Sequence, residues 1–169
     1  ILLSVGRQIP GKGYDVLAKA MIEFPNNIGL YIVGGKPEEK VKQIVEENHL
    51  NNIHFVDFKN KEELKKYYAG ADIFVFPTRS DVWGLVVNEA MSFGLPIIST
   101  NKCVAAMEFN RKFKNTEIVE ADNVLELTKA IKKLVENKEF VEKLSKNSLD
   151  GIKEYSFENM VVDFIKVLD

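Results

Sequence analysis

The chain has 169 residues, 46% of them hydrophobic, which suits one domain with a single sizeable core. Its formal net charge of -2, with no basic stripe, makes nucleic acid an unexpected partner. The single cysteine, Cys103, excludes an internal disulfide and suits a reducing cytosol, and no segment is long and apolar enough to span a bilayer. We therefore expect a cytoplasmic protein.

Short apolar runs alternate with segments of helical spacing along most of the chain. The predicted strands cover residues 1–5, 29–33, 53–56, 71–77, 97–99 and 116–119. Helices are predicted over residues 14–24, 37–48 and 61–69, from Gly84 to a stop signal at Gly94, and from Asp122, a candidate N-cap, to the chain end. This alternation predicts an α/β fold with a doubly wound parallel sheet, similar to a Rossmann fold.

The first loop, residues 6–13, is rich in glycine and follows the first strand directly. Glycines such as Gly6 let backbone approach a diphosphate, Arg7 can bind its oxygens as a fork, and Lys12 can act as a point charge. Either cation alone can also be an ordinary surface residue. The loop matches a P-loop pattern too, but Gly13 stands where Ser or Thr would hold magnesium, so ATP hydrolysis is not favoured.

The run from residue 81 to residue 100 places two carboxylates around the start of a helix. The N–H groups of Gly84 and Leu85 lack intrahelical acceptors and face the crevice beyond the carboxyl ends of the strands, where ligands bind in parallel sheets. Glu89 lies about 7.5 Å further along the helix axis and can accept hydrogen bonds from a pair of hydroxyls. Asp81, in the loop, can bind a second polyol group. The run predicts a ligand with both phosphate and hydroxyls.

Several of these residues have a structural alternative. Asp81 can cap the following helix through an Asx turn, and Trp83 fits either the core or a site wall. The segment from Glu120 to Asp122 is the nearest match to an Asp-x-Asp pair, and helix capping explains it more simply. His49 and His54 have no second ligand at metal spacing. We therefore expect no catalytic metal.

These motifs resemble the C-terminal, donor-binding domain of the glycosyltransferase 4 family of retaining GT-B glycosyltransferases. That family carries Glu, seven residues and Glu in a stretch that ends in Glu-Ala-Met, followed by Gly-Leu-Pro. Here Glu89 is the second acid, and Asp81, one methylene shorter, replaces the first. The resemblance extends to residues 4–7, 12–13, 32–37, 71–78 and 155–157. It departs at residues 103–106, which replace a Gly-Gly turn ahead of a family acid near Glu108.

The resemblance implies that residues 1–169 are one nucleotide-sugar-binding domain, the C-terminal half of a GT-B architecture, with the N-terminal acceptor domain absent. The implied enzyme transfers a hexose from a UDP- or GDP-sugar to a glycan or lipid-linked acceptor, in building a surface polysaccharide, without a metal or other cofactor. The isolated domain is expected to transfer no sugar. Any contact of the enzyme with a membrane would be peripheral and would be made by the absent domain. The final helix, residues 157–168, would cross back to that domain.

Roles follow from the resemblance residue by residue. Arg7 and Lys12 would bind the diphosphate and stabilise the departing nucleotide, Asp81 would meet the transferred sugar, and Glu89 would bind the ribose. The implied catalytic residues are Arg7, Lys12 and Asp81. The implied donor site consists of Gly6, Arg7, Lys12, Asp81, Trp83, Gly84, Leu85 and Glu89.

Two other functions stay open. A non-catalytic nucleotide-sugar-binding module, or an inactive partner subunit, would suit the shorter acid at Asp81. A GT-B sugar-nucleotide epimerase would need catalytic acids and histidines that this segment does not show.

Overall fold

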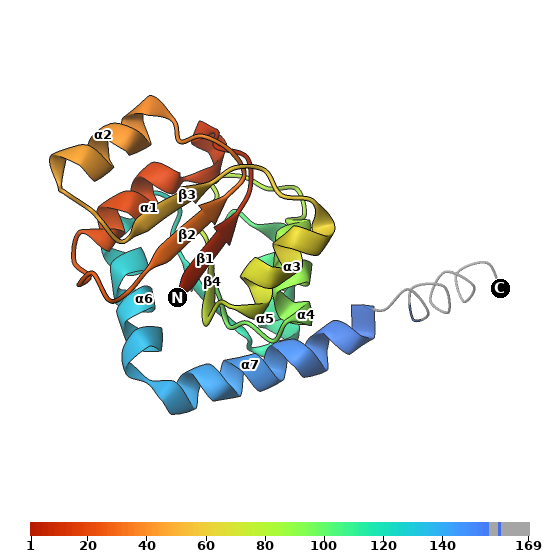
Figure 1. Ribbon diagram of the computed structural model, residues 1–169. Helices are drawn as coiled ribbons and strands as arrows, with labels where there is room; N and C mark the ends of the chain where they lie inside the picture. Colours follow the sequence, from red (N-terminus) through yellow and green to blue (C-terminus); the bar gives the residue numbers. More distant parts are fainter. Residues whose placement is uncertain (156–158, 160–169) are drawn as a thin grey trace.

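The computed structural model describes residues 1–155 and residue 159 and has a parallel sheet between two layers of helices (Figure 1). The predicted final helix over residues 157–168 lies outside the described residues. The six strands are β1 (Leu2–Val5), β2 (Leu30–Val33), β3 (Ile53–Val56), β4 (Ile73–Phe76), β5 (Ile97–Thr100) and β6 (Thr116–Val119). Their order is β3-β2-β1-β4-β5-β6 and every neighbouring pair is parallel, which confirms the predicted doubly wound sheet.

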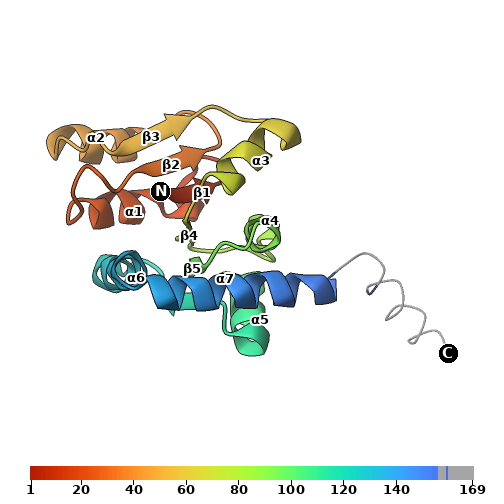
Figure 2. The ribbon, with the colours of Figure 1, turned by 60° about the horizontal axis from the view of Figure 1, so that its bottom comes forward.

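Helices cover both faces of the sheet (Figure 2). They are α1 (Tyr14–Met21), α2 (Glu39–Glu47), α3 (Lys61–Ala69), α4 (Leu85–Ser92), α5 (Val104–Phe113), α6 (Val124–Glu136) and α7 (Lys138–Ile152). One core cluster joins α1, α2 and α6 to one face, and a second joins α3, α4 and α5 to the other. None of the helices in the described ranges is long and apolar enough to cross a membrane.

The strand order reverses between β1 and β4, so the loops that follow these two strands leave the same edge of the sheet side by side. Glycine makes their close approach possible. Gly13 has a φ of 71°, and a Cβ there would lie 2.1 Å from the carbonyl oxygen of Pro77. Such a reversal is where ligands bind in open α/β sheets, so the fold places the two predicted loops at the expected crevice.

The opposite edge of the sheet is covered by α7 (Figure 1). The buried hydroxyl of Ser148 donates to the carbonyl of Leu95, just ahead of β5, at 2.8 Å. Gly151 lies against Phe113, where a Cβ would approach the ring to 2.5 Å. This long helix therefore closes the amino edge and leaves the carboxyl edge to the loops.

One prediction in the second half of the chain is wrong. Asp122 does not cap α6: Asn123 does, by accepting from the N–H of Glu126, while Asp122 has a left-handed φ of 64°. Helix α5 was not predicted. The helical segment predicted beyond Asp122 is divided into α6 and α7 at Asn137, whose side chain caps α7.

Candidate functional site

The loop over residues 6–13 forms a tight turn closed by its own backbone. The N–H of Ile9 donates to the carbonyl of Arg7 at 2.9 Å, that of Lys12 to Ile9 at 2.9 Å, and that of Gly13 to Pro10 at 3.2 Å. A P-loop directs such N–H groups at phosphates instead. The loop therefore presents side chains to a ligand more than backbone amides.

Lys12 and Asp81 are brought together, although they are far apart in the sequence. The Nζ atom of Lys12 lies 2.5 Å from Oδ2 of Asp81, and the two side chains are only 17% and 20% exposed. The same ammonium lies 4.9 Å from the ring centroid of Phe76, the last residue of β4. Lys12 thus lies between the first loop and the β4 loop, with Asp81 as its charge partner.

Arg7 is exposed, and the structure gives its guanidinium no hydrogen-bond or ion-pair partner within residues 1–155 and 159. It lies at a pocket of about 190 Å³ beyond the carboxyl ends of β1 and β2, together with Gly6 and Gly34. Phe58, 81% exposed, forms another wall of this pocket. A nucleotide fits this arrangement, with a phosphate at the unpaired cation and the base against the exposed aromatic ring.

The Asp81 segment is held firmly by the start of α5. Oδ1 of Asp81 accepts from the N–H of Trp83 at 3.3 Å, which is the Asx turn proposed as its structural alternative. The carbonyl of Trp83 accepts from the N–H of Ala105 at 2.8 Å. The Trp83 ring packs edge-on against Phe109, at a centroid distance of 5.9 Å, so Trp83 contributes to the core on this side.

The helices that follow β1 and β4 begin at the point where the strand order reverses, and their first turns differ. Helix α1 carries an acid, Asp15, in its first turn, whereas α4 carries none. Gly84, the N-cap of α4, has a φ of 93° and makes no side-chain cap, and Leu85 next to it is 68% exposed. No acidic side chain of the first turn therefore offsets the positive end of the α4 dipole.

Glu89 lies one turn beyond, in an exposed position on α4. Its Oε2 accepts from the hydroxyl of Tyr68 in α3 at 2.8 Å. Burial, reinforced by the charge of Glu89, raises the pKa of Tyr68 above its ordinary value, so the phenol stays protonated as a donor. Both residues line a pocket of about 230 Å³ between α3 and α4. Tyr68 orients one oxygen of Glu89 and leaves the carboxylate accessible to a hydroxyl ligand.

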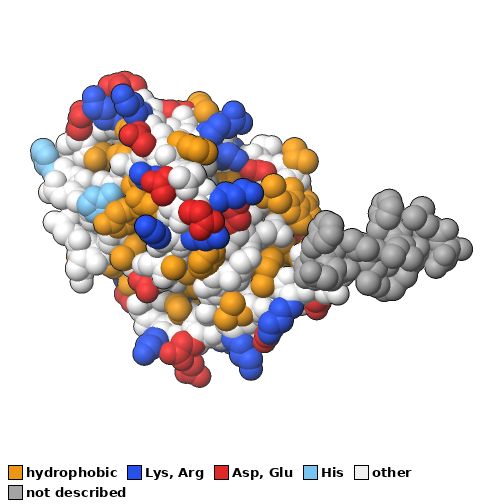
Figure 3. Space-filling view, turned by 45° about the vertical axis from the view of Figure 1, so that its right-hand side comes forward, with side chains coloured by type: hydrophobic (Ala, Val, Ile, Leu, Met, Phe, Trp, Pro, Cys, Tyr) orange, Lys and Arg blue, Asp and Glu red, His pale blue; other side chains and the backbone are white. Residues whose placement is uncertain are grey.

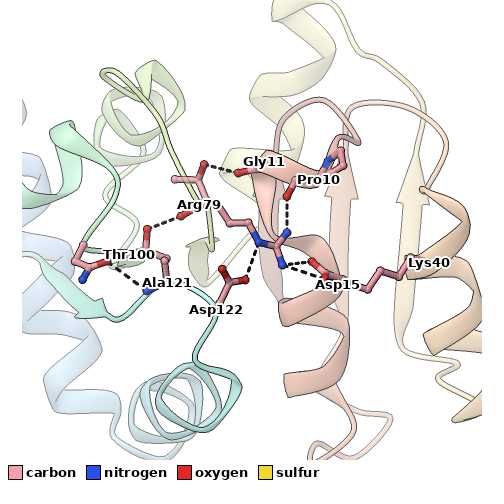
Figure 4. A network of polar contacts seen from close by, with 10 residues as sticks. Pro10, Gly11, Asp15, Lys40, Arg79, Thr100, Ala121 and Asp122 are labelled. Atoms are coloured by element: carbon pink, nitrogen blue, oxygen red, sulfur yellow. Dashed lines mark hydrogen bonds and ion pairs between the residues drawn. The ribbon is translucent and has the colours of Figure 1, made fainter.

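A polar network that the sequence did not predict surrounds Arg79, directly after β4 (Figure 4). Its Nη2 lies 2.8 Å from Asp15 and its Nε 2.6 Å from Asp122, while Nη1 donates to the carbonyl of Pro10. Lys40 pairs with Asp15 as well, at 2.6 Å. Burial alone would raise the pKa of Asp15, but hydrogen bonds and charges from Lys40 and Arg79 outweigh burial and lower this pKa.

Glu108 lies in the first half of α5 and is engaged in ion pairs. Its Oε1 lies 3.0 Å from Arg111 and 3.2 Å from Lys112, and hydrogen bonds from these residues lower the pKa of Glu108. Within the described ranges, no three His, Cys, Asp or Glu side chains form a group that could hold a metal ion. On the face shown in Figure 3, acidic and basic side chains are interspersed, with hydrophobic side chains exposed between them.

The structure therefore gathers Gly6, Arg7, Lys12, Asp81, Gly84 and Leu85 at the edge where β1 and β4 end, with Glu89 one turn into α4. Trp83 turns toward the α5 side. The sequence reasoning missed Arg79, Phe58 and Tyr68. Each follows a strand or lies on the helix beside the site, and the strand order was needed to bring them together.

Residues 1–150 match the model of the family described as Glycosyl transferases group 1. An uncharacterized glycosyltransferase of Methanocaldococcus jannaschii is 29% identical over 99% of this chain and 47% of its own length. The lipopolysaccharide glucosyltransferase WaaG of Escherichia coli is 30% identical over 61% of this chain and 28% of its own. The chain thus spans about half the length, or less, of these relatives.

The crystal structure of Anabaena HepE in complex with UDP has the same fold, with a TM-score of 0.87 over 99% of this chain and 48% of that one, at 18% identity. The six-stranded parallel sheet flanked by helices thus matches a GT-B glycosyltransferase structure. With the family match over residues 1–150, the conclusion is that this chain belongs to the group 1 glycosyl transferases.

Proposed function

We propose that the chain is the donor-binding, C-terminal domain of a retaining glycosyltransferase of family 4. The whole enzyme would transfer a hexose from a UDP- or GDP-sugar to a glycan or lipid-linked acceptor, in the cytoplasm, during synthesis of a surface polysaccharide. An N-terminal domain outside this chain would bind the acceptor. The relatives' greater length and the named glucosyltransferase among them support this division.

One observation carries the proposal. The loops after β1 and β4 meet where the strand order reverses, and they bring Lys12, the free cation Arg7 and the acid-free first turn of α4 to one edge. Two side-chain cations and a helix N-terminus match the charge of a diphosphate. The similarity of the fold to HepE, which was solved with UDP, agrees with this ligand class.

The family resemblance implies the roles of the residues, and this geometry is compatible with them. Lys12 and Arg7 would bind the diphosphate and stabilise the charge that develops on the departing nucleotide, without a metal. Once the diphosphate replaces Asp81 as the partner of Lys12, the carboxylate of Asp81 is free to bind a hydroxyl of the sugar. Glu89 would bind the ribose, and the pocket walled by Phe58 would accept the base.

Isothermal calorimetry tests the proposal directly. The chain is titrated with UDP and GDP, in EDTA and in magnesium, with UMP and GMP as controls that lack the second phosphate. We expect at least one diphosphate to bind equally well in both buffers and its monophosphate to bind about tenfold or more weakly, since one charge-assisted contact is lost. Binding that requires magnesium argues against the metal-free site. Binding of neither diphosphate argues against the proposed function.

Transfer itself requires more than this chain. Orienting the acceptor against the donor's anomeric carbon is worth about 7–11 kcal/mol, and this domain cannot supply that orientation alone. The isolated chain is therefore expected to bind donor without transferring sugar, and adding the N-terminal domain should restore transfer. Saturable transfer by the isolated chain would contradict this division.

The pairing of Asp81 with Lys12 also favours a second candidate, a non-catalytic nucleotide-sugar-binding module, because the acid is already engaged. The two candidates differ in the two-domain protein. An enzyme transfers sugar and loses transfer in Asp81→Asn, whereas a binding module shows no transfer even when donor and a panel of acceptors are saturating.

A further inference from the structure

Arg79 lies between three segments that meet at the carboxyl edge of the sheet (Figure 4). Its own backbone follows β4, Pro10 belongs to the first loop, and Asp122 belongs to the turn between β6 and α6. The side chain is 28% exposed. Few single residues can fix three separate loops, and the planar guanidinium has the several donors needed for it.

The charge of Arg79 is balanced by carboxylates of the protein, and each of its nitrogens already has a protein acceptor. Each of its three nitrogens donates to a protein acceptor, and two carboxylates, Asp15 and Asp122, face the two cations Arg79 and Lys40. The four charges cancel. Arg79 therefore differs from Arg7, which is free, and its effect on a bound anion must pass through the groups that it holds.

The groups it holds belong to the diphosphate loop. The backbone N–H of Arg79 donates to the carbonyl of Gly11 at 2.8 Å, and the hydroxyl of Thr78 donates to the same oxygen at 3.0 Å. With the side-chain bond to Pro10, three hydrogen bonds from Thr78 and Arg79 fix the residues directly before Lys12. The position of the Lys12 ammonium depends on that turn.

We propose that Arg79 is a positioning residue for nucleoside-diphosphate binding: it holds the turn at Pro10 and Gly11, so that the backbone that carries Lys12 is already in place when the diphosphate displaces Asp81. This inference rests on the proposed function. Asp15 and Asp122 orient the guanidinium for that task from either side.

The test compares Arg79→Gln and Arg79→Lys with Arg111→Gln, whose arginine pairs with Glu108 on the surface of α5. Affinity for UDP and GDP is measured by calorimetry at least 15 °C below each melting temperature. We expect Arg79→Gln to bind about tenfold more weakly. One or two side chains that the wild type holds in place before binding would have to become ordered on binding, and this ordering costs affinity. Arg79→Lys should recover part of the loss, because an ammonium reaches one or two of the three acceptors. Arg111→Gln should bind as the wild type does.

Amide hydrogen exchange separates positioning from general stability. In Arg79→Gln the amides of Lys12 and Gly13 should exchange faster, while those of β2 and β3 keep wild-type protection. If Arg79→Gln does not fold, Asp122→Asn, which removes an exposed partner of the guanidinium, takes its place, with an expected two- to fivefold loss by the same reasoning. Wild-type affinity in the folded variant would overturn the positioning role alone. Failure of the wild type to bind any nucleoside diphosphate would overturn the proposed function, and the role with it.

Discussion

The two corners where β1 and β4 turn into helices share a glycine N-cap and differ in whether the first helical turn carries an acid. Both helices, α1 and α4, begin at a glycine with positive φ, Gly13 and Gly84. The first turn of α1 carries the acid Asp15, which pairs with Arg79 and Lys40, whereas the first turn of α4 carries no acid. We name the first corner the support corner, and we propose that the second, the receptor corner, binds an anion.

The largest effect is expected where the support corner is broken. A Cβ at Gly13 would collide with the carbonyl of Pro77, and φ is left-handed there, so Gly13→Ala should cost more than about 2 kcal/mol of the free energy of unfolding. Gly11→Ala, in the same loop with nothing within 4 Å, is the control and should stay within about 1 kcal/mol. Urea denaturation measures both. Equal free energies of unfolding for the two variants would show that the backbone at Pro77 can move to accommodate the added Cβ.

Removing the cation beside the receptor corner comes next. Lys12→Met keeps the length of the side chain and should weaken UDP or GDP binding about ten- to a hundredfold, the value of a charge-assisted contact of about 1.5–3 kcal/mol. Lys19→Met, at an exposed position of α1, is the control and should leave affinity unchanged. Calorimetry provides both values, and an unchanged affinity in Lys12→Met would remove this residue from the site.

Making the receptor corner resemble the support corner should move stability and affinity in opposite directions. Leu85→Asp places an acid at the exposed first position of α4. It should stabilise the helix by about 0.3–1 kcal/mol and weaken diphosphate binding about three- to tenfold. Leu85→Asn is the control, because it removes the leucine without adding a charge. If affinity does not fall while the melting temperature rises, the anion binds elsewhere.

A smaller, favourable effect is expected at Asp81. Because Asp81 and the diphosphate compete for Lys12, Asp81→Asn should bind UDP or GDP roughly two- to fivefold more tightly, the range of a partly exposed ion pair. The gain should vanish in a Lys12→Met background. The sequence alone predicts unchanged nucleotide binding, so weaker or equal binding would refute the competition that the structure indicates.

The smallest effect concerns pH at the support corner. The pKa of Asp15 is lowered from 3.8 in the folded state, so its contribution to stability is complete above that value and is lost as pH falls through the folded pKa. Between pH 6 and pH 3, Asp15→Asn should lose less stability than the wild type. Asp57→Asn, at an exposed loop position, should follow the wild type. Parallel curves for Asp15→Asn and the wild type would contradict this assignment.

The parts of the fold predicted well were those with strong local signals. Strand β4 was predicted over residues 71–77 and occurs at Ile73–Phe76. Helix α3 was predicted at its observed limits, where Asn60 and Glu63 form a capping box. Apolar runs and caps act within a few residues, so the sequence displays them directly.

Helix α5 was missed because its ends carry weak signals. Cys103 at its start makes no side-chain cap, and Lys114, with a φ of 54°, occupies the left-handed position that glycine usually marks. The break between α6 and α7 at Asn137 also lacks glycine or proline. The capping side chain of Asn137 was the local signal at the second boundary, and it was not recognised.

The sequence motifs of the candidate site could be predicted, whereas the contacts between its residues could not. Residues after β1 and β4 were recognised by type and spacing, and the strand order placed them together. The Arg79 network joins residues 43, 64 and 69 positions apart, so no local pattern indicates it. Asp81 was assigned to the sugar without its ion pair to Lys12, because that contact depends on how two loops meet.

The most direct test of the account is to map ligand binding on the chain by amide chemical shifts in NMR. UDP or GDP, whichever binds, is titrated into labelled protein. We expect the largest shifts at Gly6, Lys12, Gly84 and Leu85 on the carboxyl edge, with Ser148 in α7 at the opposite edge unchanged. Shifts that centre on α7 or on the outer face of α6, with Gly84 and Leu85 unmoved, would contradict it.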